Sequence, residues 1–155
     1  MIEIVHIGNY GKSDCKSIYF LGPSLMEKHH YNWCPVAIQI LRKFNFCGTV
    51  FVPLFKEGHE SLHADDRTAW ELQCLDRASA IAIGVPSAYE FLRISSLAVE
   101  SSLHRYAGKI VVGHPLSSKN QPHRPYYLFG NKTIPVESTL QTMLVHAVRI
   151  TQSNK

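Results

Sequence analysis

Two glutamates, Glu71 and Glu100, are the strongest candidates for catalytic residues in this sequence of 155 residues. Each lies just beyond a junction between a predicted strand and a predicted helix, and α/β sheets bind their ligands at such junctions. Two carboxylates that meet in one cleft suit glycosidic-bond chemistry, because one attacks or stabilises the anomeric carbon while the other handles the proton. The alternative interpretation of each residue is a solvated glutamate on a helix face.

A second set of chemically suitable residues is the segment His59-Glu-Ser-Leu-His63, which matches the H-E-x-x-H pattern of zinc proteases. Gly58 precedes it, its flanks are polar, and we expect it in a long loop over residues 54–66 rather than on a buried helix. The chain has nine histidines, so a chance match arises easily. We therefore expect no metal site, with a zinc hydrolase as an alternative function.

Phosphate-binding signatures are absent from the sequence. It contains neither a G-x-G-x-x-G fingerprint nor a Walker A motif, and we expect no cofactor. Gly22-Pro23 follows a predicted strand, and the Gly22 amide and the Ser24 hydroxyl could hold a sugar or phosphate oxygen at the strand tip. A plain turn is the alternative interpretation of this segment.

The elements that would position these residues alternate between strands and helices. Apolar and β-branched runs predict strands at residues 2–7, 17–21, 49–53, 80–86 and 109–112, with a short one at 126–129. Helical spacing of apolar residues predicts helices at 33–46, from 65 to about 78, from about 96 to 106 and from about 136 to 150, and Gly48 is expected to end the first. This alternation predicts a single domain over residues 1–155 with a three-layer α/β architecture and a mostly parallel sheet.

Composition narrows the possible partners. The net charge is +4 and no run of Lys or Arg occurs, so we expect no duplex nucleic acid as partner. No apolar stretch approaches the roughly 20 residues of a membrane span, so we expect no membrane association. The four cysteines lack C-x-x-C spacing, which indicates free thiols in a reducing cytosol and a cytoplasmic location.

An ordered set of short segments carries a family resemblance. They are Ile18-Tyr-Phe-Leu-Gly-Pro23, Trp33, Val50-Phe-Val-Pro53, Asp66, Trp70-Glu71, Leu75, Ala78, Ile81-Ala82, Val85-Pro86 and Val99-Glu100. Over about residues 17–115 the chain resembles the nucleoside 2-deoxyribosyltransferase family, particularly its nucleoside 2-deoxyribosyltransferase-like branch. The resemblance implies a Rossmann-like or flavodoxin-like sandwich and a homo-oligomer with active sites at subunit interfaces.

The resemblance also implies roles for particular residues. Glu100 would attack C1′ of a 2′-deoxynucleoside, expel the base and form a covalent glycosyl-enzyme, which a second base or water would resolve with retention. Glu71 would help to protonate the departing base, and Tyr19 would hydrogen-bond and orient the nucleophile. Substrate contacts are expected from Gly22, Pro23, Ser24, Asp66, Trp70, Ser96 and Asn131, the last lent by a neighbouring subunit.

The sequence departs from the family pattern at Ser79, Ile94, Ala98 and Ser102. A changed substrate or an inactive site would each account for these departures. Two alternatives therefore stand beside a nucleoside enzyme. One is a hydrolase of nucleoside 5′-monophosphates that holds the phosphate with the hydroxyls of Ser24, Ser95 and Ser96. The other is a catalytically silent module that binds a nucleotide in the same pocket.

Overall fold

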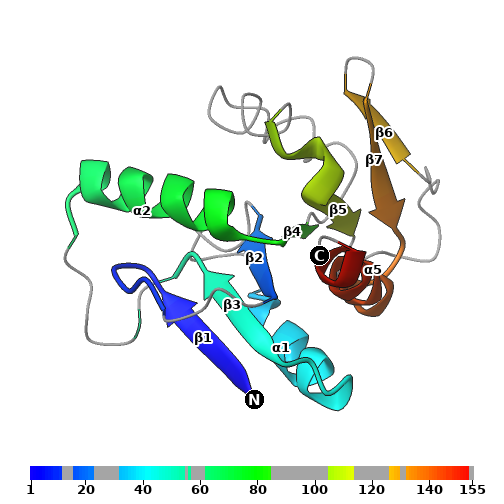
Figure 1. The fold of residues 1–155 in the computed structure, drawn as a ribbon, viewed down its shortest axis with the longest axis horizontal. Coiled ribbons are helices and arrows are strands. Elements are labelled where there is room, and N and C mark those ends of the chain that lie inside the picture. The colour runs from blue at the N-terminus through cyan, green and yellow to red at the C-terminus, as the bar shows by residue number, and fades with distance from the viewer. Residues whose placement is uncertain are drawn as a thin grey trace.

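A seven-stranded sheet forms the centre of the molecule (Figure 1). The computed structural model describes residues 1–11, 16–22, 32–54, 56, 62–84, 105–113 and 132–153, and the backbone of 126–129. The strands are β1 (Ile2–His6), β2 (Ser17–Leu21), β3 (Gly48–Val52), β4 (Ala80–Gly84), β5 (Ile110–Gly113), β6 (Tyr126–Phe129) and β7 (Lys132–Glu137). Their spatial order is β1-β3-β2-β4-β5-β7-β6.

The sheet is mostly parallel, which confirms the predicted fold class. Strands β1, β3, β2, β4, β5 and β7 run parallel, and β6 pairs antiparallel with β7 as a hairpin. From β3 to β7 the order of the strands is that of a flavodoxin-like doubly wound sheet, in which the first strand of the chain lies between the second and the third. Here β2 is that first strand, and β1 extends the sheet beyond β3.

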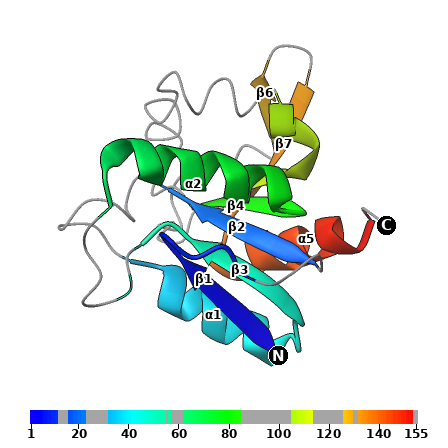
Figure 2. The same ribbon diagram turned by 60° about the vertical axis from the view of Figure 1, so that its left-hand side comes forward.

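Helices cover both faces of the sheet, giving three layers (Figure 2). Helices α1 (Cys34–Lys43) and α5 (Leu140–Ser153) pack on one face and contact each other. Helix α2 (Ala64–Arg77) packs on the other face, and the short 3₁₀ helix η2 (Ala107–Lys109) precedes β5. Within the described ranges no helix is long and apolar enough to cross a bilayer.

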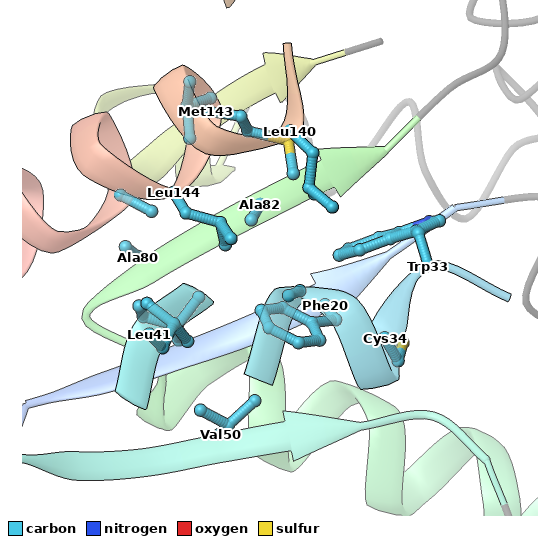
Figure 3. Close-up of a cluster of buried hydrophobic side chains, with 14 of the residues drawn as sticks. Phe20, Trp33, Cys34, Leu41, Val50, Ala80, Ala82, Leu140, Met143 and Leu144 are labelled. Atoms are coloured by element: carbon cyan, nitrogen blue, oxygen red, sulfur yellow. The ribbon is translucent and has the colours of Figure 1, made fainter. Parts of the chain in front are cut away.

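Strand β2 supplies side chains to both layers because successive residues of a strand point to opposite faces. Ile18 and Phe20 enter the core beneath α1 and α5 (Figure 3), whereas Tyr19 enters the core beneath α2. All three are fully buried. A strand that is apolar on both faces is typical of the centre of a parallel sheet, and β2 pairs with β3 on one side and β4 on the other.

The C-terminal region differs from the sequence prediction, which placed a helix from about Val136. Residues Lys132–Glu137 instead form β7, with Val136 opposite Val112 of β5. Helix α5 begins only at Leu140, because the hydroxyl of Thr139 accepts a hydrogen bond from the Thr142 amide, at 3.1 Å, and caps the first turn.

The end of the first helix also differs from the prediction. Helix α1 ends at Lys43, and the left-handed residue that follows is Asn45, with φ 53°, rather than a glycine. Gly48 is the first residue of β3. A Cβ atom there would lie 2.1 Å from the carbonyl oxygen of Lys16, so glycine is required by a close approach of two backbones.

Candidate functional site

The candidate site lies where β2 and β4 end, at the point where the strand order reverses. From β2 the chain moves to β3 on one side of the sheet and later to β4 on the other, and such a switch point opens a crevice outside the carboxyl ends of the strands. Gly22 and Gly84 lie at these ends, and both are buried. A Cβ atom on Gly22 would lie 2.3 Å from the Gly84 carbonyl oxygen, so the two strand ends approach closely.

Tyr19 places a polar group inside the core on the α2 side of this region. Its side chain is fully buried, and its hydroxyl has no hydrogen-bond partner among the residues that the structure describes. A buried hydroxyl without a partner costs about 1–3 kcal/mol. Its ring lies 6.3 Å from the ring of Trp70, at an interplanar angle of 46°. The position is therefore well packed but polar, which is unusual in a core made for stability alone.

Glu71 lies close enough to Tyr19 to affect its ionisation. Burial raises the pKa of the Tyr19 phenol, the negative charge of Glu71 raises it further, and the positive charge of Arg67 opposes them. Arg67 Nε lies 3.4 Å from Glu71 Oε1, in a pair whose side chains are 27% and 33% exposed. The phenol thus keeps its proton, and solvent still reaches the Glu71 carboxylate on the helix that packs over it.

Two other predicted site residues on α2 have different surroundings. Trp70 has no exposed surface, and its indole N–H donates to the carbonyl oxygen of Asn9 at 2.6 Å, so it packs in the core. Asp66 is exposed in the first turn of α2. A helix turns about 100° per residue, so the Asp66 and Glu71 side chains project about 140° apart. Glu71 lies on the helix that packs over the core containing Tyr19, and Asp66 projects from another side of that helix.

Several predicted site residues lie outside the described residues. They are Glu100, Pro23, Ser24, Ser96 and Asn131. Their proposed roles stay predictions, including the meeting of Glu100 with Glu71. The first histidine of the H-E-x-x-H segment, His59, also lies outside, whereas His63 is exposed at the start of α2. The part of the chain that the structure describes contains no group of three side chains able to hold a metal ion.

Trp33 is a notable residue that the sequence analysis missed as a functional candidate. It is 1% exposed, and its indole Nε1 has no hydrogen-bond partner within the described ranges. Its ring packs 4.9 Å from the ring of Phe20 and lies against Gly84, where a Cβ atom would come within 2.5 Å of it. Figure 3 shows the indole nitrogen on the side where β2 and β4 end. No sequence pattern signals this, because the unpaired N–H results from packing between distant segments.

Ser79, one departure from the family pattern, has a structural role. The Ser79 amide donates to the hydroxyl of Ser17 at 3.1 Å, and this hydroxyl donates to the carbonyl oxygen of Arg77, also at 3.1 Å. Ser79 directly precedes β4 and Ser17 opens β2, so these contacts join the amino ends of the two strands. They lie at the opposite edge of the sheet from Gly22 and Gly84. The Ser79 hydroxyl also accepts a hydrogen bond from the Ser17 amide at 3.3 Å, so the side chain at position 79 stabilises the sheet away from the switch point.

An open cleft of about 670 Å³ borders β1 at the edge of the sheet. Its lining includes Glu3, His6 and Lys56. Glu3 accepts a hydrogen bond from the Thr49 hydroxyl at 3.2 Å, and His6 Nδ1 lies 3.3 Å from the carbonyl oxygen of Leu54. Two of its polar side chains thus already have partners within the protein, and β3 separates β1 from β2 in the sheet.

No protein-family model matches the chain, and no curated protein matches it. The family resemblance of the sequence therefore stays a prediction, and any assignment of function depends on the residues and their geometry.

Proposed function

We propose that the protein cleaves or transfers the N-glycosyl bond of nucleosides or 2′-deoxynucleosides, with Glu100 as the nucleophile. The observation that supports this proposal is the buried hydroxyl of Tyr19, which has no hydrogen-bond partner among the described residues and lies in the core under α2, the helix that carries Glu71. In a two-carboxylate mechanism, a neutral donor such as Tyr19 can orient the nucleophile, and a partly exposed carboxylate such as Glu71 can handle the proton. The flavodoxin-like strand order supports a ligand site at this edge of the sheet.

The reaction proceeds in two displacements. The Glu100 carboxylate attacks C1′, the bond from C1′ to the base nitrogen breaks, and the base departs with a proton from Glu71. The resulting glycosyl ester on Glu100 is then attacked at C1′ by water or by a second base, which loses its proton to Glu71. Two inversions at C1′ give net retention.

Tyr19 and Arg67 position the two carboxylates in this mechanism. In the complex with substrate, the Tyr19 hydroxyl donates a hydrogen bond to Glu100, which holds the carboxylate facing C1′ and gives the phenol the partner that it lacks among the described residues of the free protein. Arg67, one helical turn before Glu71, holds the Glu71 side chain through its Nε. Neither residue exchanges a proton with the substrate.

The test is release of free base from a panel of nucleosides, 2′-deoxynucleosides and their 5′-monophosphates, followed by chromatography. The intact protein is compared with Glu100→Gln and with Asp65→Asn, an exposed-residue control on α2. We expect release by the intact protein and the control, and none by Glu100→Gln. An acid-quenched reaction should show the mass of one glycosyl group added to the peptide that contains Glu100.

Three outcomes would contradict the proposal. Full activity of Glu100→Gln would remove Glu100 as nucleophile. Release without any glycosyl-peptide, together with inversion at C1′, would exclude the covalent mechanism. Stabilisation of the fold by nucleotides without turnover of any substrate would identify a binding module in place of an enzyme.

A further inference from the structure

The outer edge of strand β1 carries backbone groups that no described strand pairs with. Strand β1 ends the sheet on the side opposite β6 and β7 (Figure 1). The Ile7 amide donates to the carbonyl oxygen of Leu54, which follows β3, at 3.2 Å, so the backbone of Ile7 faces the β3 side. Backbone groups along a strand alternate between its two sides. Ile2, Ile4 and His6 therefore direct their N–H and C=O groups outward, away from the sheet.

Strand β1 lacks the features with which proteins usually block a free edge. Its sequence, Ile2-Glu-Ile-Val-His6, contains no proline and no lysine, and all five of its residues pair in register with β3 without a bulge. Its one carboxylate, Glu3, accepts a hydrogen bond from the Thr49 hydroxyl of β3 at 3.2 Å, which draws it toward β3. Ile2 and Ile4 are only partly buried. An apolar edge of this kind can pair with another strand.

Two clefts leave room for the side chains of an added strand. One, of about 670 Å³, includes in its lining Val5, which belongs to the core beneath α2. The other, of about 340 Å³, is lined by Ile2, Arg42 and Phe46, and Phe46 belongs to the core beneath α1. Successive side chains of a strand point to opposite faces. A strand paired with β1 would therefore direct its side chains to both clefts.

A second copy of β1 fits this edge in one register. Antiparallel strands pair residues whose backbone groups face each other, so Ile4 can lie opposite Ile4 of the other copy, with Ile2 opposite His6. This register uses the whole strand and gives a two-fold symmetric contact. A shift of two residues in one direction would place Glu3 opposite Glu3, which the like charges disfavour. A shift in the other direction would leave Ile2 and Glu3 without a partner.

The charges at the two ends of β1 are complementary in this arrangement. Glu3 lies near the amino end of the strand, whereas Lys56 follows Leu54 near the carboxyl end, and both charged residues line the larger cleft. An antiparallel copy brings each Glu3 toward Lys56 of the other copy, so both ends of the pair gain an attraction. The edge is thus complementary to itself in its backbone, apolar and charged groups.

We propose that the protein assembles as a two-fold symmetric dimer in which the outer edges of two β1 strands pair antiparallel, with Ile4 opposite Ile4. Each Ile4 amide donates to the carbonyl oxygen of the other Ile4, and the sheet continues from one copy into the next. Because β3 lies between β1 and β2, this interface adds no residue to the switch point. It therefore differs from the interface that the family resemblance implies, at which active sites lie, and it does not depend on the proposed function.

Cysteine cross-linking of the full chain tests the contact. In a background with Cys15→Ser and Cys47→Ser, we expect Ile4→Cys to form an intermolecular disulfide under mild oxidation. The Cα atoms of hydrogen-bonded residues that lie opposite each other are about 5.5 Å apart, which a disulfide can span. Gln39→Cys, exposed on α1, is the control for random collision and should form little disulfide.

Mixing two variants in the same background tests the register. Ile2→Cys and His6→Cys should each cross-link poorly alone and should form a disulfide-linked heterodimer when mixed, because Ile2 lies opposite His6 of the other copy. The two copies of Ile2 would lie roughly 13 Å apart along the strands, too far for a disulfide. Efficient linkage of Ile2→Cys to itself would overturn the inference.

Sedimentation equilibrium at several micromolar concentrations measures the dimer itself. We expect the intact chain to be dimeric and the dimer Kd of Ile4→Pro to be at least about tenfold higher, because proline removes the N–H from both central hydrogen bonds. The Ile4 N–H faces away from β3, so the variant should keep its fold. Leu72→Ala, which truncates an exposed apolar residue on α2, should leave the Kd unchanged.

Two outcomes of these measurements would overturn the inference. An intact chain that stays monomeric at every concentration would do so, and a strand of a different protein would then be the remaining occupant of the edge. A dimer that is unaffected by Ile4→Pro and forms no Ile4→Cys disulfide would place the contact elsewhere. If Ile4→Pro fails to fold, the cross-links decide. Base release should be equal in the intact chain and in folded Ile4→Pro, so the dimer and the enzymatic function are tested separately.

Discussion

The hydroxyl of Tyr19 on β2 lies in the field of the Glu71 carboxylate on α2, and it has no hydrogen-bond partner among the described residues. The strand and the helix pack against each other, so the two groups keep this relationship without a bond between them. Burial and the neighbouring negative charge both raise the pKa of the phenol, which keeps its proton available for donation.

Replacement of Tyr19 by Phe should leave the fold intact, because no described hydrogen bond is lost. We expect the free energy of unfolding to stay the same or rise by about 1 kcal/mol, measured by urea denaturation. Tyr106→Phe is the matched control, since the Tyr106 hydroxyl donates to Asp76 and its removal should cost about 1 kcal/mol. A loss in Tyr19→Phe equal to that of the control would mean that the Tyr19 hydroxyl is paired.

The same variant should be a poor catalyst. We expect kcat for base release to fall about tenfold in Tyr19→Phe with little change in KM, because the lost donor orients the nucleophile rather than binding substrate. A rise in KM at constant kcat would assign the hydroxyl to substrate binding instead.

Glu71→Gln should slow base release by about 100-fold, because an amide cannot supply the proton that the departing base needs. The loss should be smaller for bases that leave readily without protonation, and a comparison of several bases measures this. The fold should lose at most about 0.5 kcal/mol, since the pair with Arg67 is partly exposed. Asp65→Asn, exposed on the same helix, should behave as the intact protein.

How far the sequence predicted the site depends on the kind of residue. Tyr19 and Glu71 were named from the family resemblance, and the structure places them on β2 and α2, two elements that pack against each other. Trp33 appeared in the same resemblance without a role. Its importance comes from a packing contact with Gly84 and from a missing partner, and neither property has a local sequence pattern.

Gly84 is required by the indole that lies over it. In Gly84→Ala the new Cβ atom would lie 2.5–2.8 Å from three ring atoms of Trp33, so we expect the free energy of unfolding to fall by about 1–3 kcal/mol. Gly108→Ala is the control, because nothing lies within 4 Å of a Cβ atom there, and its stability should change by less than about 0.5 kcal/mol. Urea denaturation of the two variants measures this difference. Equal stability of Gly84→Ala and Gly108→Ala would contradict the close contact between Gly84 and the Trp33 indole.

The fold itself was largely predictable because its strands are short, apolar and β-branched. The prediction failed at β7, where Pro135 and polar flanks interrupt the run and Val136 fits the helical spacing that follows. Helical spacing of apolar residues also does not fix which of them are buried, since Val36 of α1 and Leu72 of α2 are 38% and 51% exposed. Apolar residues on both sides of a helix leave its buried face ambiguous, and only the packing of the sheet decides it.

Cys34 should make the fold less stable at alkaline pH. Burial raises the pKa of its thiol from 9.0 to about 12. Below pH 9 the thiol is protonated in both states. Between pH 9 and about pH 12 the unfolded chain loses the thiol proton that the folded chain keeps. The free energy of unfolding therefore falls as pH rises, by at most about 1.4 kcal/mol per pH unit.

Urea denaturation of the intact protein and of Cys34→Ala between about pH 8 and pH 10.5 measures this effect. The variant should be less stable at the lower pH, because a buried side chain is truncated, and should show a shallower decline with pH. Equal slopes of stability against pH in the two proteins would contradict the assignment of this effect to Cys34. Mapping of alkylated peptides at about pH 8 should find Cys47, which is exposed, modified before Cys34.

The pairing of β1 with β3 also bears on how the chain acquires its structure during synthesis. Strand β1 leaves the ribosome before β2, but its described pairing is with β3, which emerges after β2 and α1 have been made. Strand β1 can therefore pair only after β3 has been made, and we expect it to join the edge of the sheet after the central strands have paired. In the monomer, amides of Ile2–His6 are thus expected to exchange with solvent before those of β2 and β4, which are paired on both sides.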